Sequence, residues 1–257
     1  GSEMCIRDSK YGDTDISSFV NFVQNKIDIN GIVNTMRDGQ FVNGNAVFVS
    51  PNGMVIGKSG VLNVGSLSVV TPTQEAYNEF TGNGQYYAPI LSAPGTPEYE
   101  TVVNSMGGGI VTVNGKVLAR DMINIDAGKV DIGSTSKMIT GVKSDVAFTP
   151  DGSYVNGPDD AEAIEENGRD PEFGNPIRHF YDDKISTASS ISLADALFNS
   201  LVNTNISNAG SIRNDKGSIT INAYNNTDGI IAYDGSLLKN FGNGDINITN
   251  KGAQGTV

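Results

Sequence analysis

The chain has 257 residues, of which 38% are hydrophobic and 7% aromatic, with no Trp and 31 Gly. Its formal net charge is −12, which excludes the basic surface typical of nucleic-acid-binding proteins and disfavours contact with anionic membranes. The single cysteine, Cys5, excludes an intramolecular disulfide. No apolar run approaches the roughly 18 residues of a transmembrane helix.

The first residues do not share the pattern of the rest. Gly1 to Ser9 contain neither an apolar run nor strand-like alternation, and we expect them to be an assembly scar outside the fold. Residues 10–257 are expected to form a single domain. Its first strands are predicted within 16–35, where Asn30-Gly31 forms a turn. Phe19 and Phe22 are expected to cap or fill the open end of the structure.

Residues 46–71 give the clearest structural signal. Short runs of β-formers, such as 47–49 and 54–56, are separated by Gly, Pro, Asn and Ser. Each run is too short for a helix, and Ser50-Pro51-Asn52-Gly53 has the residues that a β-turn requires. Short strands with a corner after each one favour an all-β chain that coils as a parallel β-helix. In such a coil, each turn buries its apolar residues against its neighbours.

Two stretches interrupt this pattern and are predicted to be insertions. The first, 72–109, contains four prolines, several tyrosines and Gly107-Gly108-Gly109, and a short helix is expected over 98–106. The second, 143–204, contains an acidic segment and a short α-helix over Ser192 to Val202, which Ser192 can cap. Residues 110–132 return to the strand pattern. Repeats within 206–253, about 42 residues apart, predict two turns of about twenty residues each.

The residues form no recognisable catalytic or metal site. The acidic residues of 151–172 match neither the EF-hand loop nor the Ca²⁺-binding nonapeptide, so a solvated loop is the simpler interpretation and a Ca²⁺ site the alternative. A glycosidase needs two facing carboxylates, and neither Asp121 with Asp126 nor Asp182 with Asp183 has a supporting spacing. His179 could be a general base, although a surface histidine is the simpler interpretation. We therefore expect no catalytic residue, metal or cofactor.

A family resemblance is carried by FVNFVQNKIDINGIVNT and GNAVFVSPNGMVIGKSGVLNVGSLSVVTPT, within residues 19–73. These segments resemble the N-terminal secretion domain of two-partner-secretion exoproteins, the filamentous-haemagglutinin family, and look closest to leukotoxin-type filamentous adhesins. The family's signature turn is Asn-Pro-Asn-Gly, and Ser50-Pro51-Asn52-Gly53 matches it with Ser for the first Asn. Further positions match the family pattern: Gly57, Gly60, Val61, Asn63, Gly65 and Leu67.

The resemblance implies a right-handed parallel β-helix that is exported through the periplasm to the cell surface or the medium. It also implies a partner, the POTRA domains of an outer-membrane β-barrel transporter. On this basis the chain is predicted to be a monomeric, non-catalytic secretion and adhesin module that neither binds nucleic acid nor inserts into a membrane. Residues 50–53 either contact the transporter or only fix a turn. The resemblance does not extend to the two insertions.

Two other functions stay open. Parallel β-helices also carry polysaccharide lyases and glycosidases, so a carbohydrate-active enzyme is one alternative. The other is binding of a host-cell surface or glycan by the insertions, with Tyr86, Tyr87 and Tyr99 as stacking platforms. Tyrosines that pack on the flank of the coil are the simpler interpretation of these three residues.

Overall fold

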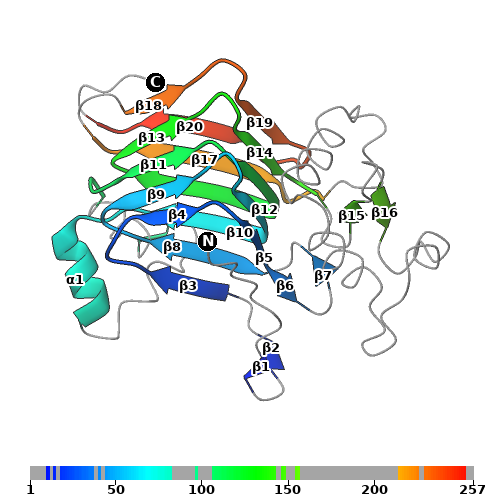
Figure 1. Cartoon of the computed structure of the whole chain (residues 1–257), viewed down its shortest axis with the longest axis horizontal. Coiled ribbons are helices and arrows are strands. Elements are labelled where there is room, and N and C mark those ends of the chain that lie inside the picture. The colour runs from blue at the N-terminus through cyan, green and yellow to red at the C-terminus, as the bar shows by residue number, and fades with distance from the viewer. Residues whose placement is uncertain are drawn as a thin grey trace.

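The structure is a computed structural model of the whole chain. It describes residues 10–11, 14–15, 18–37, 40–41, 44–82, 96–97, 106–142, 146–148, 154–156, 214–225 and 229–252. The expected scar at 1–9 and the expected helix at 192–202 lie outside these residues. The described part is mostly β, which confirms the all-β prediction, and most of its strands belong to two parallel sheets of nine and five strands (Figure 1).

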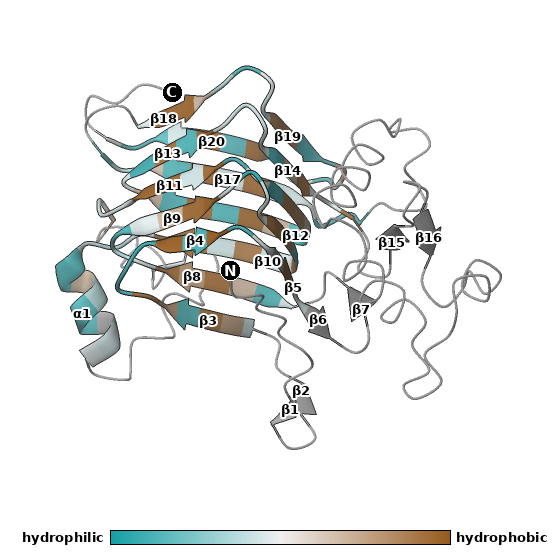
Figure 2. Cartoon of the chain, in the orientation of Figure 1, coloured by the Kyte–Doolittle hydropathy of each residue, from teal (hydrophilic) through white to brown (hydrophobic). Residues whose placement is uncertain are grey.

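The chain runs through the same series of strand positions repeatedly, and we call each repeat of this path a pass. The five-stranded sheet has one strand from each of five successive passes. In spatial order its strands are β4 (Ile27–Ile29), β9 (Gly53–Ile56), β11 (Ile110–Val113), β13 (Lys129–Ile132) and β18 (Ile230–Ala232). All neighbours are parallel and in register, so that Met54 lies between Ile27 and Val111. Hydrophobic residues recur along these strands because alternate side chains face the interior (Figure 2).

The nine-stranded sheet has two arms that share the long strands β10 (Val61–Val70) and β12 (Lys116–Ala127). The first arm contains the second halves of β10 and β12 with β3 (Ser18–Phe22), β8 (Asn45–Val49), β17 (Ser218–Ala223) and β20 (Ile246–Asn250). The second arm contains the first halves with β5 (Ile32–Asn34), β14 (Lys137–Thr140) and β19 (Leu237–Asn240). A pass therefore runs through the first arm, the five-stranded sheet and the second arm in turn.

The arms diverge at a register shift between Val64 and Ser66. β10 is nevertheless one continuous strand, with an irregularity at Gly65-Ser66. Gly65 is required at this bend, because a Cβ would lie 2.7 Å from the amide nitrogen of Gly44 in the preceding pass.

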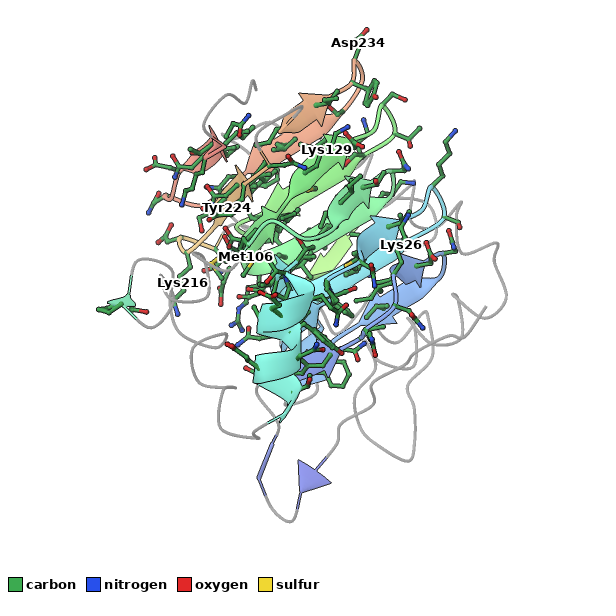
Figure 3. All side chains as sticks on the ribbon, turned by 90° about the vertical axis from the view of Figure 1, so that its left-hand side faces the viewer. Lys26, Met106, Lys129, Lys216, Tyr224 and Asp234 are labelled. Carbon is green, nitrogen blue, oxygen red and sulfur yellow. The ribbon has the colours of Figure 1, made fainter. Side chains whose placement is uncertain are left out.

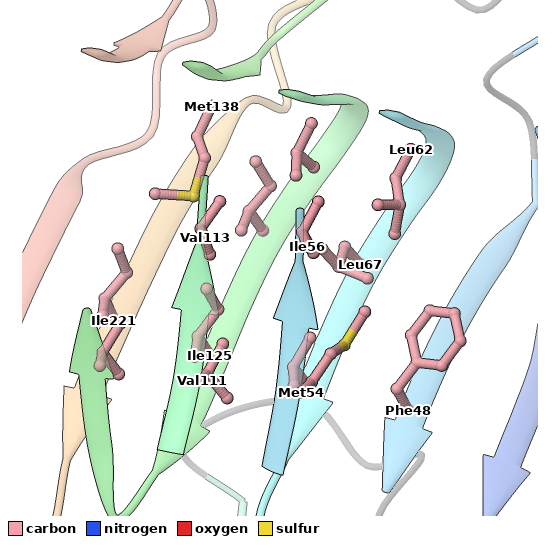
Figure 4. Packing of buried hydrophobic residues seen from close by; sticks show 14 of the residues in the cluster. Phe48, Met54, Ile56, Leu62, Leu67, Val111, Val113, Ile125, Met138 and Ile221 are labelled. Carbon is pink, nitrogen blue, oxygen red and sulfur yellow. The ribbon is translucent and has the colours of Figure 1, made fainter. Parts of the chain in front are cut away.

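The core lies between the five-stranded sheet and the two arms, which we call the three ladders, and it is almost entirely aliphatic. Rows of identical or similar residues run through successive passes, and Leu67, Ile123 and Ile219 face one another in register at 0% exposure. Figure 4 shows Phe48, Met54, Ile56 and their neighbours packed in this space. Close packing of each pass against the next explains how a chain with few aromatics buries a core. In the last pass, Ile246 and Ile248 are 42% and 37% exposed.

The first insertion leaves the sheets after β10 and returns at β11. Its entry and exit are held together, since the Gly108 amide donates to the Thr71 carbonyl (3.3 Å) and Pro72 forms a β-bridge with Met106. The expected helix at 98–106 is wrong at Met106, which is in this bridge, and residues 98–105 lie outside the described part. Instead, α1 (Gln74–Gly82) begins after Thr73, whose Oγ1 accepts a hydrogen bond from the Ala76 amide (3.2 Å).

Helix α1 covers the outer face of the first arm (Figure 3). Ala76 and Tyr77 form an apolar cluster with Val47, Val49 and other outward residues of the arm. Phe22 packs against this cluster, with its ring centroid 6.3 Å from that of Tyr77. The expectation that Phe22 covers the open end is therefore wrong, because its register beside Val49 turns it to the outer face.

The second insertion follows β14 and is closed in the same way, since the Asn214 amide donates to the Gly141 carbonyl (2.7 Å). Its described residues form the antiparallel pair β15 (Val146–Phe148) and β16 (Tyr154–Asn156). Two further antiparallel pairs join β1 (Lys10–Tyr11) to β2 (Thr14–Asp15) and β6 (Met36–Arg37) to β7 (Gln40–Phe41).

The passes are not of equal length. Ser66 lies opposite Asn45, 21 positions earlier, whereas Ile246 lies opposite Ile219, 27 positions earlier. The length of about twenty residues predicted for the repeats within 206–253 therefore underestimates the last pass, which is as long as the first, where Asn45 lies opposite Ser18. The corner 241–245, which stands where the shorter pass has only Gly65, accounts for most of the difference.

Candidate functional site

The Ser50–Gly53 turn connects β8 to β9, at the corner between the first arm and the five-stranded sheet. Ser50 is 2% exposed, Pro51 and Gly53 are buried, and only Asn52 is exposed. The four residues are therefore part of the packed structure, with one side chain available at the surface.

The turn is tied to the preceding pass by its polar side chains. Ser50 Oγ donates to the Asn25 carbonyl (2.9 Å) and accepts a hydrogen bond from the Asn52 amide (3.3 Å). Asn52 Nδ2 donates to the Gln24 carbonyl (2.6 Å). Serine at the first position thus joins two passes and closes its own turn.

Glycine backbones hold the turn against the following passes. Gly53 has φ +86°, a conformation that other residues rarely adopt, and a Cβ there would overlap the Ile110 carbonyl. A Cβ on Gly109 would overlap the Gly53 amide, and one on Gly128 would lie 2.6 Å from the Gly108 carbonyl. We call Gly53, Gly109 and Gly128 the glycine corner. The sequence pattern did not relate Gly107–Gly109 to the turn, although three consecutive glycines before a strand are a signal of close backbone approach.

The next corner, between the five-stranded sheet and the second arm, is packed differently. A Cβ on Gly57 would overlap Oδ1 of Asn30, and a Cβ on Gly133 would overlap Oδ1 of Asn114. We call Asn30, Gly57, Asn114 and Gly133 the asparagine corner. Hydroxyls support each step, since Ser59 Oγ donates to the Asn30 carbonyl (2.8 Å) and Thr135 Oγ1 to the Asn114 carbonyl (2.7 Å). Short Asn-Gly corners therefore alternate with longer corners that contribute a hydroxyl.

Asp121 and Asp126, which were considered as a carboxylate pair without a supporting spacing, are bound in separate polar groups. Asp121 pairs with Arg120 (Nη2 to Oδ2, 2.6 Å) and accepts a hydrogen bond from Asn214 Nδ2 (2.8 Å). Asp126 is 1% exposed. Its carboxylate accepts hydrogen bonds of 2.8–2.9 Å from Asn124 Nδ2, Asn222 Nδ2 and the Tyr224 hydroxyl. These donors join strands of different passes, so both aspartates have structural roles.

The other predicted site residues lie outside the described residues: Tyr86, Tyr87, Tyr99, His179, Asp182, Asp183 and the acidic residues of 151–172. Within the described ranges, no group of three His, Cys, Asp or Glu side chains is arranged to hold a metal ion. No helix in that part of the chain is long and apolar enough to span a membrane.

Two ionisable groups away from the turn are affected by burial. Desolvation raises the pKa of Tyr77, on α1, and lowers the pKa of Lys239. The Lys239 ammonium lies 4.6 Å from the ring centroid of Phe241. Both shifts have a packing origin, and neither group lies at the Ser50–Gly53 turn.

No family model, curated protein or solved structure matches the chain. The class of protein that the structure defines is therefore a mostly-β protein with parallel sheets, in which glycine and asparagine corners join the strands.

Proposed function

We propose that the passes form one right-handed parallel β-helix and that this coil is the N-terminal secretion and adhesin module of a two-partner-secretion exoprotein. The coil is supported by parallel pairing on all three ladders and by a core to which every ladder contributes. The two insertions would then be excursions from its corners. Their closed entry and exit points allow the coil to continue past them.

One observation carries the proposal: the positions that match the family pattern all pack between passes. Val61, Asn63 and Leu67 are at most 2% exposed. A Cβ on Gly57 would overlap Asn30, one on Gly60 would overlap the Ile29 carbonyl, and one on Gly65 would lie 2.7 Å from the Gly44 amide. The residues that carry the resemblance are therefore ones that the stacking of passes requires, as expected if the chain shares the family's architecture.

The buried turn favours a structural role for residues 50–53 in the folded module. A transporter could reach the Asn52 side chain on the folded surface, whereas Ser50 and Pro51 are accessible only before the corner closes. The module would thus pass the outer membrane unfolded, which the absence of an intramolecular disulfide permits, and fold as successive passes stack. No described residue favours the carbohydrate-active alternative, because Asp121 and Asp126 are both held by neighbouring donors.

Secretion is the direct test. The chain would be given a signal peptide and expressed with and without a two-partner transporter, and the amount in the medium would be measured. We expect transporter-dependent release, reduced by Asn52→Ala, which removes the bond to Gln24. Asn247→Ala removes an exposed asparagine from the last strand and is the matched control. Folded protein that stays in the periplasm when the transporter is present would contradict the proposal.

A further inference from the structure

Asn-Gly dipeptides are the chemically least stable peptide units of this chain. The sequence contains eight of them, and the structure describes both residues of four: Asn30-Gly31, Asn52-Gly53, Asn114-Gly115 and Asn243-Gly244. Asparagine is a thermolabile residue, and a following glycine offers the least steric hindrance to attack by its own amide nitrogen.

The reaction requires no reagent other than water. The glycine amide nitrogen attacks Cγ of the asparagine and forms a new N–Cγ bond. The Cγ–Nδ2 bond then breaks, and the side-chain nitrogen leaves as ammonia, which carries the proton lost by the attacking amide. Water opens the resulting succinimide at either carbonyl and yields aspartate or isoaspartate. The step changes no oxidation state, and its rate depends on whether the attacking amide is free.

Three of the four described pairs are protected by the fold. The Gly53 amide donates to the Ser50 carbonyl (3.3 Å), the Gly115 amide to the Ile56 carbonyl (3.1 Å) and the Gly244 amide to the Gly217 carbonyl (3.0 Å). Each of these amides would have to give up its hydrogen bond before it could attack. An unmade backbone hydrogen bond is costly, so folding slows the reaction at these three sites.

Asn30-Gly31 differs from the other three. The Gly31 amide donates no hydrogen bond to any described residue, and a Cβ on Gly31 would meet no atom within 4 Å. Asn30 is exposed to solvent, so water can reach the succinimide. We propose that Asn30 is a site of spontaneous deamidation and isoaspartate formation in the folded protein, and that the other three pairs react more slowly there because their glycine amides are hydrogen-bonded.

The site lies where such a change would separate two passes. The Asn30 carbonyl accepts from Ser59 Oγ (2.8 Å), and the Gly31 carbonyl accepts from the Val61 amide (2.9 Å). In isoaspartate the backbone runs through Cβ and Cγ of residue 30, which adds one carbon to the chain, and the former Asn30 carbonyl becomes a side-chain carboxylate. Both bonds cannot then keep their register, and β5 loses its alignment with β10. The modification would therefore loosen the first pass without cutting the chain.

The test compares folded and denatured protein during incubation at mildly alkaline pH, with conversion at each Asn measured by peptide mass spectrometry and an isoaspartate methyltransferase assay. In the folded protein, Asn30 is expected to convert about tenfold faster than Asn52, Asn114 or Asn243, the factor that corresponds to about one hydrogen bond. In denaturant the four rates should become similar. Hydrogen exchange at the Val61 amide should increase in the converted fraction.

Gly31→Ala is the matched variant, because its Cβ fits without contact and Gly31 has no positive φ. It should fold like the parent chain, as judged by denaturant unfolding, and suppress conversion at Asn30. The proposal is overturned if Asn30 converts no faster than the other three in the folded protein, or if Gly31→Ala leaves its rate unchanged. Unchanged exchange at Val61 after conversion would overturn the proposed loosening of the first pass. The experiment involves no transporter, so its outcome is independent of the secretion proposal.

Discussion

The glycine corner and the asparagine corner solve the same packing problem in different ways. Both must bring each pass close to the next. At the glycine corner, Gly53, Gly109 and Gly128 allow backbone to pack directly on backbone. At the asparagine corner, the side chains of Asn30 and Asn114 occupy the space left by Gly57 and Gly133 in the following pass.

Glycine therefore makes room for a backbone at one corner and for a side chain at the other. A backbone that meets a backbone has nothing that can be shortened, so a glycine there cannot be replaced without moving a strand. An asparagine side chain that meets a glycine can be shortened, so the contact can be rebuilt from either side. Substitutions at the two corners should therefore differ in whether a second substitution rescues the first.

The largest effect is expected at the glycine corner, from Gly53→Ala. The fold requires a positive φ at this position, which alanine disfavours, and the new Cβ overlaps the Ile110 carbonyl. We expect a loss of at least about 3 kcal/mol in the free energy of unfolding. Denaturant unfolding of the purified chain measures this loss. Stability within about 0.5 kcal/mol of the parent chain would contradict backbone-on-backbone packing at this corner.

At the asparagine corner, Gly133→Ala should cost about 1–3 kcal/mol because the new methyl group overlaps Oδ1 of Asn114. Asn114→Ala in the same chain should recover most of that loss, since the Val113 carbonyl would then be the nearest remaining group, at 3.4 Å. A double-mutant cycle on unfolding free energies gives the coupling. Additive effects would show that Asn114 is not the obstacle. Ile110→Ala combined with Gly53→Ala is the control without expected rescue, because the obstructing atom there is a backbone oxygen.

Hydroxyl groups at the two corners should also differ. Ser50 Oγ is in a buried position and makes two hydrogen bonds, whereas Ser59 Oγ makes one from a half-buried position. We expect Ser50→Ala to cost about 1–2 kcal/mol and Ser59→Ala about 0.5 kcal/mol in unfolding free energy. Thermal and denaturant unfolding of both variants test the order. Equal losses would show that burial of the Ser50 bonds does not strengthen them.

Much of the strand pattern could be predicted from the sequence because each short run carries its own signal. The runs at 47–49 and 54–56 fall within β8 and β9, and Pro51-Asn52-Gly53 forms the predicted turn. β10 ends at Val70 and β11 begins at Ile110, and the predicted insertion at 72–109 lies between them. Local turn chemistry and the strand pattern suffice for these features.

The features that were missed depend on contacts between passes. Helix α1 has no long apolar stripe, and Ala76 and Tyr77 are buried because valines of the first arm lie beneath them. The relation between Gly109 and Gly53 likewise joins positions 56 residues apart. A single sequence does not show which positions are stacked, so the glycine corner becomes visible only when the register is known.

The last expected effect has the opposite sign and concerns Ser136, on the same edge as the asparagine corner. Ser136 precedes β14 where Gly60 and Gly115 precede the aligned starts of β10 and β12. It is 0% exposed, and its Oγ has no hydrogen-bond partner among the described residues. A buried hydroxyl without a partner is unfavourable, so Ser136→Ala should raise the unfolding free energy by up to about 1 kcal/mol. Ser134→Ala, at an exposed position of the same turn, should change it by less than about 0.5 kcal/mol.

A loss of stability in Ser136→Ala would show that the hydroxyl is bound in solution, with a buried water as the simplest partner. In that case this position would be a third kind of corner, filled by solvent where the other two are filled by backbone or by a side chain.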